Sequence, residues 1–293
     1  MKKILILSVC LFVCWALPAQ QQRMKVACVG NSITYGTGLA DRATQSYPVQ
    51  LQKLLGEHYE VENFGKPGAT LLNQGHRPYT RQEEYRKALD FAGDIVVIHL
   101  GINDTDPRDW PNYRDSFVTD YLNLMDTFRK ANPDVRIIIA RMTPIADRHN
   151  RFLSGTRDWH GEIQTAIETV ARYAGVQLID FHEPLYPYPS LLPDAVHPTA
   201  EGAAIMAQTV YSAITGDYGG LQLSPLYTDN MVLQRDTPLL IHGTANVGEQ
   251  VTVRIDRQQW ITKAALDGKW SVKLSPLKAG GAYTCLLYTS PSP

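Results

Sequence analysis

The chain has 293 residues, which is long enough for one large domain and a smaller one. Hydrophobic residues make up 44% of the sequence and charged residues 19%, proportions that are typical of a globular protein. The formal net charge of -1 gives the chain no polybasic character, so we expect no nucleic-acid partner.

The first 19 residues have the pattern of an export signal. Two lysines precede an apolar stretch over residues 4–17, and small residues follow it. This stretch is too short to span a bilayer comfortably, so we expect no stable membrane insertion and a mature protein that is periplasmic or extracellular. Removal of the signal leaves Cys28 and Cys285 in different candidate domains, and we expect no disulfide between them.

The first strand-like run of the mature chain ends beside a serine. Residues 25–30 are apolar and β-prone, the run stops at Gly30, and Ser32 follows where a strand passes into a loop. Open α/β sheets keep their chemistry at this kind of junction, so Ser32 is a candidate nucleophile. It could also simply cap the next helix. A phosphate-binding loop fits poorly, because Asp41 stands where a dinucleotide turn needs its third glycine, and we expect no cofactor.

Strand-like and helical segments alternate after this junction. Further runs with strand character cover residues 59–64, 95–100, 136–140 and 176–180. Apolar residues at helical spacing cover residues 47–55, 81–91, 115–130, 159–174 and 199–215. This alternation predicts an α/β fold, a doubly wound parallel sheet with helices on both faces, in a domain over residues 24–217.

The pattern changes at residue 219. Short β-type runs at residues 239–242, 250–255 and 270–274 are separated by turn signals. They predict a small all-β module, sandwich-like, over residues 221–287. The chain then runs into Ser-Pro-Ser-Pro, so we expect residues 288–293 to be a disordered or non-native tail and the chain to be a truncated or mis-joined fragment.

The chain can supply every part of a serine hydrolase, which needs a nucleophile, a base, an acid that orients the base, and donors for the oxyanion. His197 is the natural base for Ser32. Asp194, three residues earlier, can reach the other ring nitrogen of this histidine within one loop. Oxyanion donors could come from the backbone N–H groups of Ser32 and Gly65 and from the side-chain amide of Asn103.

Four short blocks in this order resemble those of the SGNH (GDSL-like) hydrolase family. The blocks are Gly30-Asn31-Ser32, Gly65, Gly101-x-Asn103-Asp104 and Asp194-x-x-His197. The resemblance covers residues 25–215 and implies a flavodoxin-like three-layer fold and ester hydrolysis through an acyl-serine intermediate. It implies the same roles as above for Ser32, Gly65, Asn103, Asp194 and His197. Asn31 departs from the aspartate that many members carry.

The β-module adds a second resemblance. Residues 226–235, 243–245 and 267–270 resemble the amino-terminal β-region of sialate O-acetylesterases, a family in which a further catalytic region follows. This implies an acetylated carbohydrate as substrate, with sialic acids favoured. Xylan acetylesterase, lysophospholipase or thioesterase, and an inactive glycan-binding protein are the alternatives. The sequence specifies no oligomeric state.

Several other residues are candidates for smaller roles. By their place in loops, three residues could line the sugar site: Tyr35, Arg77 and Tyr79. We expect His99 to be a buried core histidine and Asp104 to hold its own loop as a hydrogen-bond acceptor, while His182 is a weaker candidate base. No grouping of histidines, cysteines and acids has metal-ligand spacing, so we expect no metal.

Overall fold

The computed structural model describes residues 23–149, 156–255, 258–280 and 282–290. The predicted export signal over residues 1–19 therefore lies outside the described residues. Within the described ranges, every helix is too short or too polar to cross a membrane.

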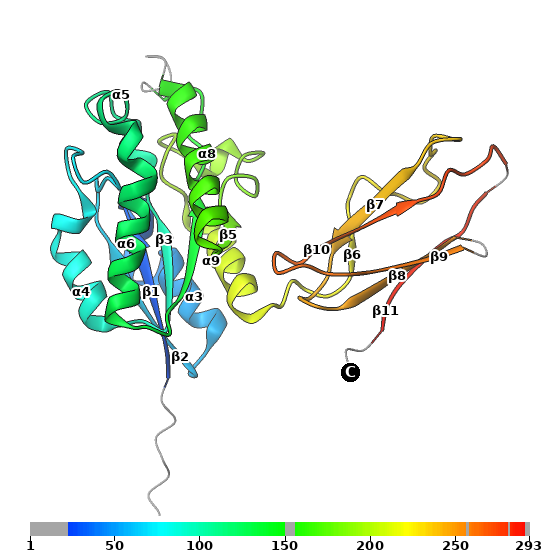
Figure 1. Ribbon diagram of the computed structural model, residues 1–293, viewed down its shortest axis with the longest axis horizontal. Helices are drawn as coiled ribbons and strands as arrows, with labels where there is room; N and C mark the ends of the chain where they lie inside the picture. The colour runs from blue at the N-terminus through cyan, green and yellow to red at the C-terminus, as the bar shows by residue number, and fades with distance from the viewer. Residues whose placement is uncertain (1–22, 150–155, 256–257, 281, 291–293) are drawn as a thin grey trace, which may run out of the picture.

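The first domain is built on a five-stranded parallel sheet (Figure 1). Its strands are β1 (Met24–Gly30), β2 (Tyr59–Gly65), β3 (Ile95–His99), β4 (Arg136–Arg141) and β5 (Gln177–Asp180), in the spatial order β2-β1-β3-β4-β5. The strand order reverses beside β1, which pairs with both β2 and β3. This is the flavodoxin-like switch point, where open α/β sheets bind their ligands. The predicted doubly wound sheet is confirmed.

Helices cover both faces of this sheet, because each crossover between parallel strands must pack a helix back onto it. On one face, α4 (Glu83–Phe91), α6 (Phe117–Ala131) and α8 (Thr156–Ala174) lie side by side. On the other face, α3 (Tyr47–Leu55) packs against α9 (Ala200–Thr215). The remaining helices are α1 (Ser32–Tyr35), α2 (Arg42–Gln45) and α5 (Trp110–Tyr113), with 3-10 turns η1 (Tyr79–Arg81), η2 (Ile102–Thr105), η3 (Arg114–Ser116) and η4 (Pro189–Leu191).

The position of β3 in the core explains its largely apolar sequence. All five of its residues are buried, as expected for a central strand covered on both faces. Cys28 on the neighbouring β1 is buried as well, and burial raises the pKa of its thiol to about 12. The Cys28 and Cys285 thiols are both free, and Cys285 lies in the other domain.

The second domain consists of two three-stranded antiparallel sheets. One has the order β10-β7-β6 and the other the order β11-β8-β9. The strands are β6 (Gln222–Leu223), β7 (Leu239–Thr244), β8 (Gln250–Ile255), β9 (Gln258–Lys263), β10 (Lys269–Leu274) and β11 (Cys285–Ser290). Alternate residues of β10 are buried in a core of its own, which is the pattern of a sandwich half-exposed to solvent. The predicted all-β module is confirmed.

Residues 288–290, which we expected to be part of a disordered or non-native tail, are not disordered in the structure. These residues belong to β11, which pairs along its whole length with β8. The pairing satisfies backbone groups that β8 would otherwise leave open at the edge of its sheet, and Leu287 packs against the module's core. Residues 291–293 lie outside the described part of the chain.

The two domains meet at the amino edge of the parallel sheet. The side chain of Gln177, at the start of β5, donates to the carbonyl of Leu266 (3.2 Å), and the Val247 N–H donates to the carbonyl of Gly216 (2.9 Å). A cavity of about 860 Å³ lies at this junction, lined on one side by Arg136 at the start of β4. The carboxyl edge of the sheet is therefore left open.

Candidate active site

Three predicted catalytic residues meet at the carboxyl edge of the sheet. The Ser32 hydroxyl lies 2.8 Å from Nε2 of His197. The other ring nitrogen, Nδ1, lies 2.5 Å from the Asp194 carboxylate. Because that carboxylate can only accept, the proton of a neutral ring sits on Nδ1 and leaves Nε2 free to accept the serine proton.

Asp194 is kept ionised by its hydrogen bonds. Partial burial alone would raise its pKa, but the His197 backbone and ring and the Val196 N–H all donate to it, and together they lower the pKa below its ordinary value. The two backbone bonds are 2.7 Å from His197 and 2.9 Å from Val196. These two backbone hydrogen bonds hold the Asp194 carboxylate in position to accept from the His197 ring.

Ser32 does not cap its helix, because Asn31 does. The Asn31 side chain accepts from the Ile33 N–H (2.9 Å), and Ser32 is the first residue of α1. The chain must turn sharply to reach this position. A Cβ at Gly30 would lie 2.8 Å from the His99 carbonyl, so only glycine fits there. The hydroxyl of Ser32 is therefore available for chemistry.

Two of the predicted oxyanion donors have a hydrogen available for a ligand. The Ser32 N–H lies in the first turn of α1, where backbone donors have no partner within the helix. The Asn103 amide on η2 donates one hydrogen to the Ala69 carbonyl (2.9 Å), which fixes its orientation and leaves the second hydrogen.

The prediction that Gly65 is the third oxyanion donor is wrong. Its N–H donates to the side chain of Asn63 (2.9 Å) and does not face the site. A Cβ on Gly65 would lie 2.2 Å from the Tyr35 nitrogen, so this glycine serves close packing of β2 against α1. Sequence blocks alone could not tell a glycine needed for packing from one that presents its N–H.

Gly68 fits the donor position better. It has φ +77, and among the described residues its N–H has no acceptor. The loop is held on both sides of it: Lys66 N–H donates to the Gly30 carbonyl (2.9 Å) beside the nucleophile, and Asn103 holds the Ala69 carbonyl. The sequence feature that could have indicated this donor is the second glycine of the turn Gly65-Lys66-Pro67-Gly68.

The three predicted sugar-lining residues separate into two groups. Tyr79 is fully buried and its hydroxyl donates to the Phe64 carbonyl (2.8 Å), so it belongs to the core and its predicted role is wrong. Arg77 is exposed, and its guanidinium donates to Pro67 (3.0 Å) beside Gly68. Tyr35 is half-buried, with the Arg42 guanidinium 4.0 Å from its ring centre. For Arg77 and Tyr35 a role in substrate binding stays a prediction.

The predictions for the neighbouring polar residues hold. Asp104 is fully buried and accepts from the N–H groups of Leu71 (2.9 Å) and Leu72 (2.8 Å), which confirms its role as a hydrogen-bond acceptor, although the loop that it holds is the one after β2 rather than its own. His99 is a core histidine whose pKa burial lowers to about 3. The His182 ring contacts Glu183 and Tyr186 rather than the serine.

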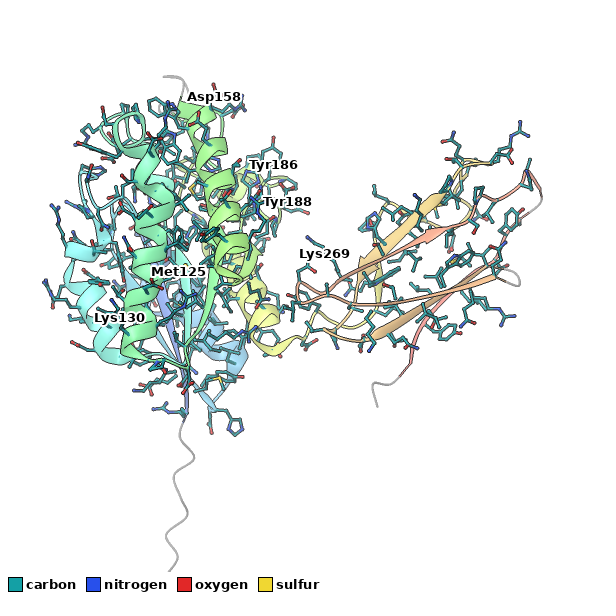
Figure 2. The ribbon with its side chains drawn as sticks, in the orientation of Figure 1. Met125, Lys130, Asp158, Tyr186, Tyr188 and Lys269 are labelled. Atoms are coloured by element: carbon teal, nitrogen blue, oxygen red, sulfur yellow. The ribbon has the colours of Figure 1, made fainter. Side chains whose placement is uncertain are left out.

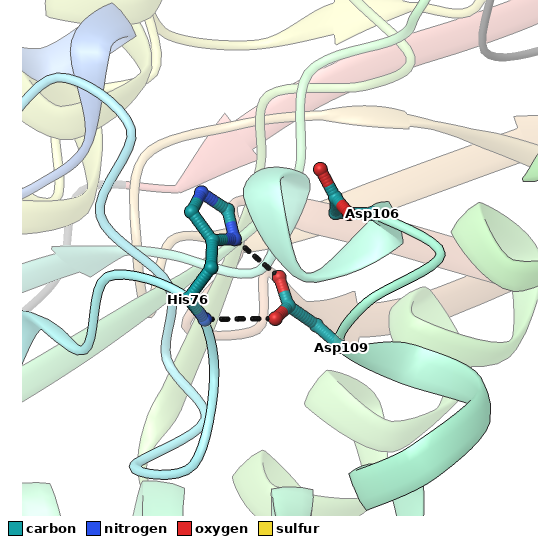
Figure 3. A group of neighbouring side chains, drawn as sticks. All are labelled: His76, Asp106 and Asp109. Atoms are coloured by element: carbon teal, nitrogen blue, oxygen red, sulfur yellow. Dashed lines mark hydrogen bonds and ion pairs between the residues drawn. The ribbon is translucent and has the colours of Figure 1, made fainter.

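A further polar cluster joins two loops of the carboxyl edge (Figure 3). Its members are His76, Asp106 and Asp109, whose ligand-type atoms lie within 4.8 Å of one another. Asp109 accepts from the His76 N–H (2.8 Å) and bonds its ring Nδ1 (2.6 Å), and the Arg108 guanidinium bonds both oxygens of Asp106. A metal ion would have to displace these partners, so the cluster is better described as a clamp between loops.

A serine bonded to a histidine that is bonded in turn to an aspartate, at the carboxyl edge of a doubly wound sheet, defines an α/β serine hydrolase. The chain belongs to the GDSL-like lipase/acylhydrolase family, whose family model matches residues 28–205. Lipases and acylhydrolases are carboxylic ester hydrolases.

The chain is also similar to individual proteins. An acetylxylan esterase of Xylanibacter ruminicola is 34% identical, in an alignment that covers 68% of this chain and 45% of that protein. The chain therefore spans about half the length of this curated relative.

Two solved structures share the fold. The acetyl xylan esterase AlAXEase is 21% identical, with a TM-score of 0.51 over 65% of this chain and 100% of that one. A GDSL-like lipase from Bacteroides thetaiotaomicron is 23% identical, with a TM-score of 0.50 over 65% of this chain and 87% of that one. At these identities the likeness shows the fold alone.

Proposed function

We propose that this protein removes O-acetyl groups from carbohydrates through an acyl-serine intermediate. The observation that carries the proposal is the continuous hydrogen-bonded series from the Ser32 hydroxyl through His197 to Asp194. Family membership and the similarity to an acetylxylan esterase support the ester chemistry and the kind of substrate.

In the acylation step, the Ser32 oxygen attacks the acetyl carbonyl while its proton moves to Nε2 of His197. Asp194 stabilises the imidazolium that forms. Collapse of the tetrahedral intermediate breaks the bond to the sugar oxygen, which takes the proton from His197. In deacylation a water molecule attacks the acetyl-serine and gives its proton to His197. Acetate leaves, and the proton returns to Ser32.

The oxyanion of each intermediate needs donors that are in place beforehand. Three groups supply them in this proposal: the Ser32 N–H, the free hydrogen of the Asn103 amide and the Gly68 N–H. Their loops are held by Asp104 and Asn103, so the donors do not have to reorganise during the reaction.

Acetylated xylan is the first substrate to test, because the curated relative is named an acetylxylan esterase. Acetylated sialic acids, which the β-module's resemblance favoured, come second. Export of the protein fits either substrate, since both occur outside the bacterial cell, and it remains part of the proposal.

The test is acetate release by the wild-type protein and by Ser32→Ala. We expect release from acetylated xylan that Ser32→Ala abolishes, with an unchanged circular dichroism spectrum. Ser271→Ala, at an exposed serine of β10, is the matched control and should retain full activity. Turnover by Ser32→Ala at the wild-type rate would exclude the proposed nucleophile. Preference for long-chain acyl esters would favour a lysophospholipase or thioesterase, and failure to hydrolyse an aryl acetate would favour an inactive glycan-binding protein.

A further inference from the structure

Two large aromatic side chains are exposed on the loop that carries the catalytic histidine. Tyr186 is 63% exposed and Tyr188 is 55% exposed. Both lie between β5 and α9, in the same connection as Asp194 and His197. They project from the flank of the α/β domain (Figure 2). The catalytic mechanism uses neither residue.

The chain holds these tyrosines in place. The Tyr186 ring stacks on the His182 ring, with centres 5.2 Å apart and planes inclined by 20°. The Tyr188 N–H donates to the carbonyl of Leu185 (3.0 Å), and the side chain of Leu185, the residue just before Tyr186, is fully buried. Prolines at 184, 187 and 189 further restrict the backbone. A ligand that bound here would meet rings that are already ordered, so binding would cost little conformational entropy.

Backbone hydrogen bonds connect this pair to the segment that carries the catalytic histidine. The Tyr188 carbonyl accepts from the Leu191 N–H (2.9 Å), and the Leu191 carbonyl accepts from the Thr199 N–H (2.8 Å), two residues after His197. The Arg148 guanidinium also donates to the carbonyls of Pro189 and Leu192 within this loop. The loop is therefore one braced unit that extends from the tyrosines to the active site.

We propose that Tyr186 and Tyr188 form a platform for sugar rings of the polysaccharide chain that carries the acetyl ester. The inference rests on the proposed carbohydrate esterase function and extends it from the acetyl group to the chain. The C–H face of a pyranose is apolar and stacks on an aromatic ring, while the tyrosine hydroxyl exchanges hydrogen bonds with ring hydroxyls. Tyrosine offers this mixed surface with few rotatable bonds to order.

The test compares acetylated xylan with acetylated xylose, a monosaccharide that carries no further sugar rings to occupy the platform. We expect the double variant Tyr186→Ala/Tyr188→Ala to lower the ratio of kcat/KM on the polymer to kcat/KM on the monosaccharide by about tenfold, which corresponds to about 1.4 kcal/mol for the loss of both rings. The loss should appear in KM, because stacking holds substrate and transition state equally. The double variant Tyr186→Phe/Tyr188→Phe should keep most of the ratio.

Tyr173→Ala is the matched control, because this tyrosine is 80% exposed at the carboxyl end of α8, which leads into the start of β5 at the amino edge of the sheet, opposite the catalytic edge. An unchanged ratio in the alanine double variant would overturn the proposal. So would an equal loss of kcat on both substrates, which would mean that the tyrosines only support His197.

The platform proposal and the esterase proposal can be refuted independently of each other. If the wild-type protein hydrolyses neither substrate, the carbohydrate esterase proposal is wrong. Retardation of Ser32→Ala protein in a gel containing deacetylated xylan still tests the platform. Retardation that the tyrosine-to-alanine changes remove supports it, and migration that the polymer does not alter refutes it.

Discussion

At the scale of single residues, the hydrogen bond that the Asp194 carboxylate accepts from the His197 ring decides which ring nitrogen carries the proton. Asp194→Asn would place an amide there that can donate to Nδ1, so the proton of the neutral ring would move to Nε2. Nε2 could then no longer accept the serine proton. We expect kcat on an aryl acetate to fall on the order of 10³- to 10⁴-fold with little change in fold. A loss of less than tenfold in steady-state kinetics would contradict this role.

The protonation of Asp104 should make the free energy of unfolding depend on pH. Burial raises its pKa from the ordinary value to about 7. The folded protein therefore binds the proton more tightly than the unfolded chain, so this contribution to stability is present at low pH and is lost as pH rises from about 4 to about 7. The free energy of unfolding of the wild type relative to Asp104→Asn should fall by a few kcal/mol between about pH 5 and about pH 8. Urea unfolding of both proteins measures this, and a difference independent of pH would contradict it.

At the scale of elements, the helix over residues 47–55 was predicted with its observed bounds, and every strand of the parallel sheet was found within a residue or two. Buried strands and amphipathic helices carry their own periodic pattern. The edge strands β9 and β11 were not predicted, although they are as long as β8, because the pairing with β8 that stabilises each of them is not apparent in their own sequence. Gly65 was misassigned as an oxyanion donor because its surroundings also cannot be seen in its sequence block. Its N–H donates to the Asn63 side chain, and its lack of a Cβ allows β2 to pack against α1.

The clamp in Figure 3 joins elements that are far apart in the sequence, which is why no local pattern indicated it. It connects the loop that carries Gly68 to the loop that carries Asn103. We expect His76→Phe to lower kcat about tenfold, because slightly displaced oxyanion donors stabilise the transition state less, with KM unchanged.

Two controls accompany this prediction. Asp126→Asn breaks an exposed ion pair with Arg129 on α6, far from the loops, and should leave kcat unchanged. Dialysis against a chelator should not alter activity, since the partners of Asp106 and Asp109 are protein groups. Loss of activity on chelation that is restored by a divalent cation would show instead that the cluster holds a metal.

At the scale of the whole molecule, each domain has a hydrophobic core of its own. The contacts between them lie at the amino edge of the sheet, the opposite edge from Ser32 and His197. The Tyr218 hydroxyl and the Gln177 side chain both donate to the Leu266 carbonyl (3.1 and 3.2 Å). The β-module therefore braces the base of the catalytic domain and does not line the catalytic residues.

This arrangement predicts a specific result for a protein that ends at residue 217. Its kcat/KM on an aryl acetate should equal that of the longer chain, because Ser32, His197, Asp194 and the loops that hold them lie within the first domain. Its melting temperature should be lower, because Gln177 and the last turn of α9 lose their partners in the β-module. Calorimetry and steady-state kinetics on both proteins separate the two effects. A large fall in kcat/KM without unfolding would mean that the module reaches the catalytic edge in solution, and the assignment of its contacts to the opposite edge would be wrong.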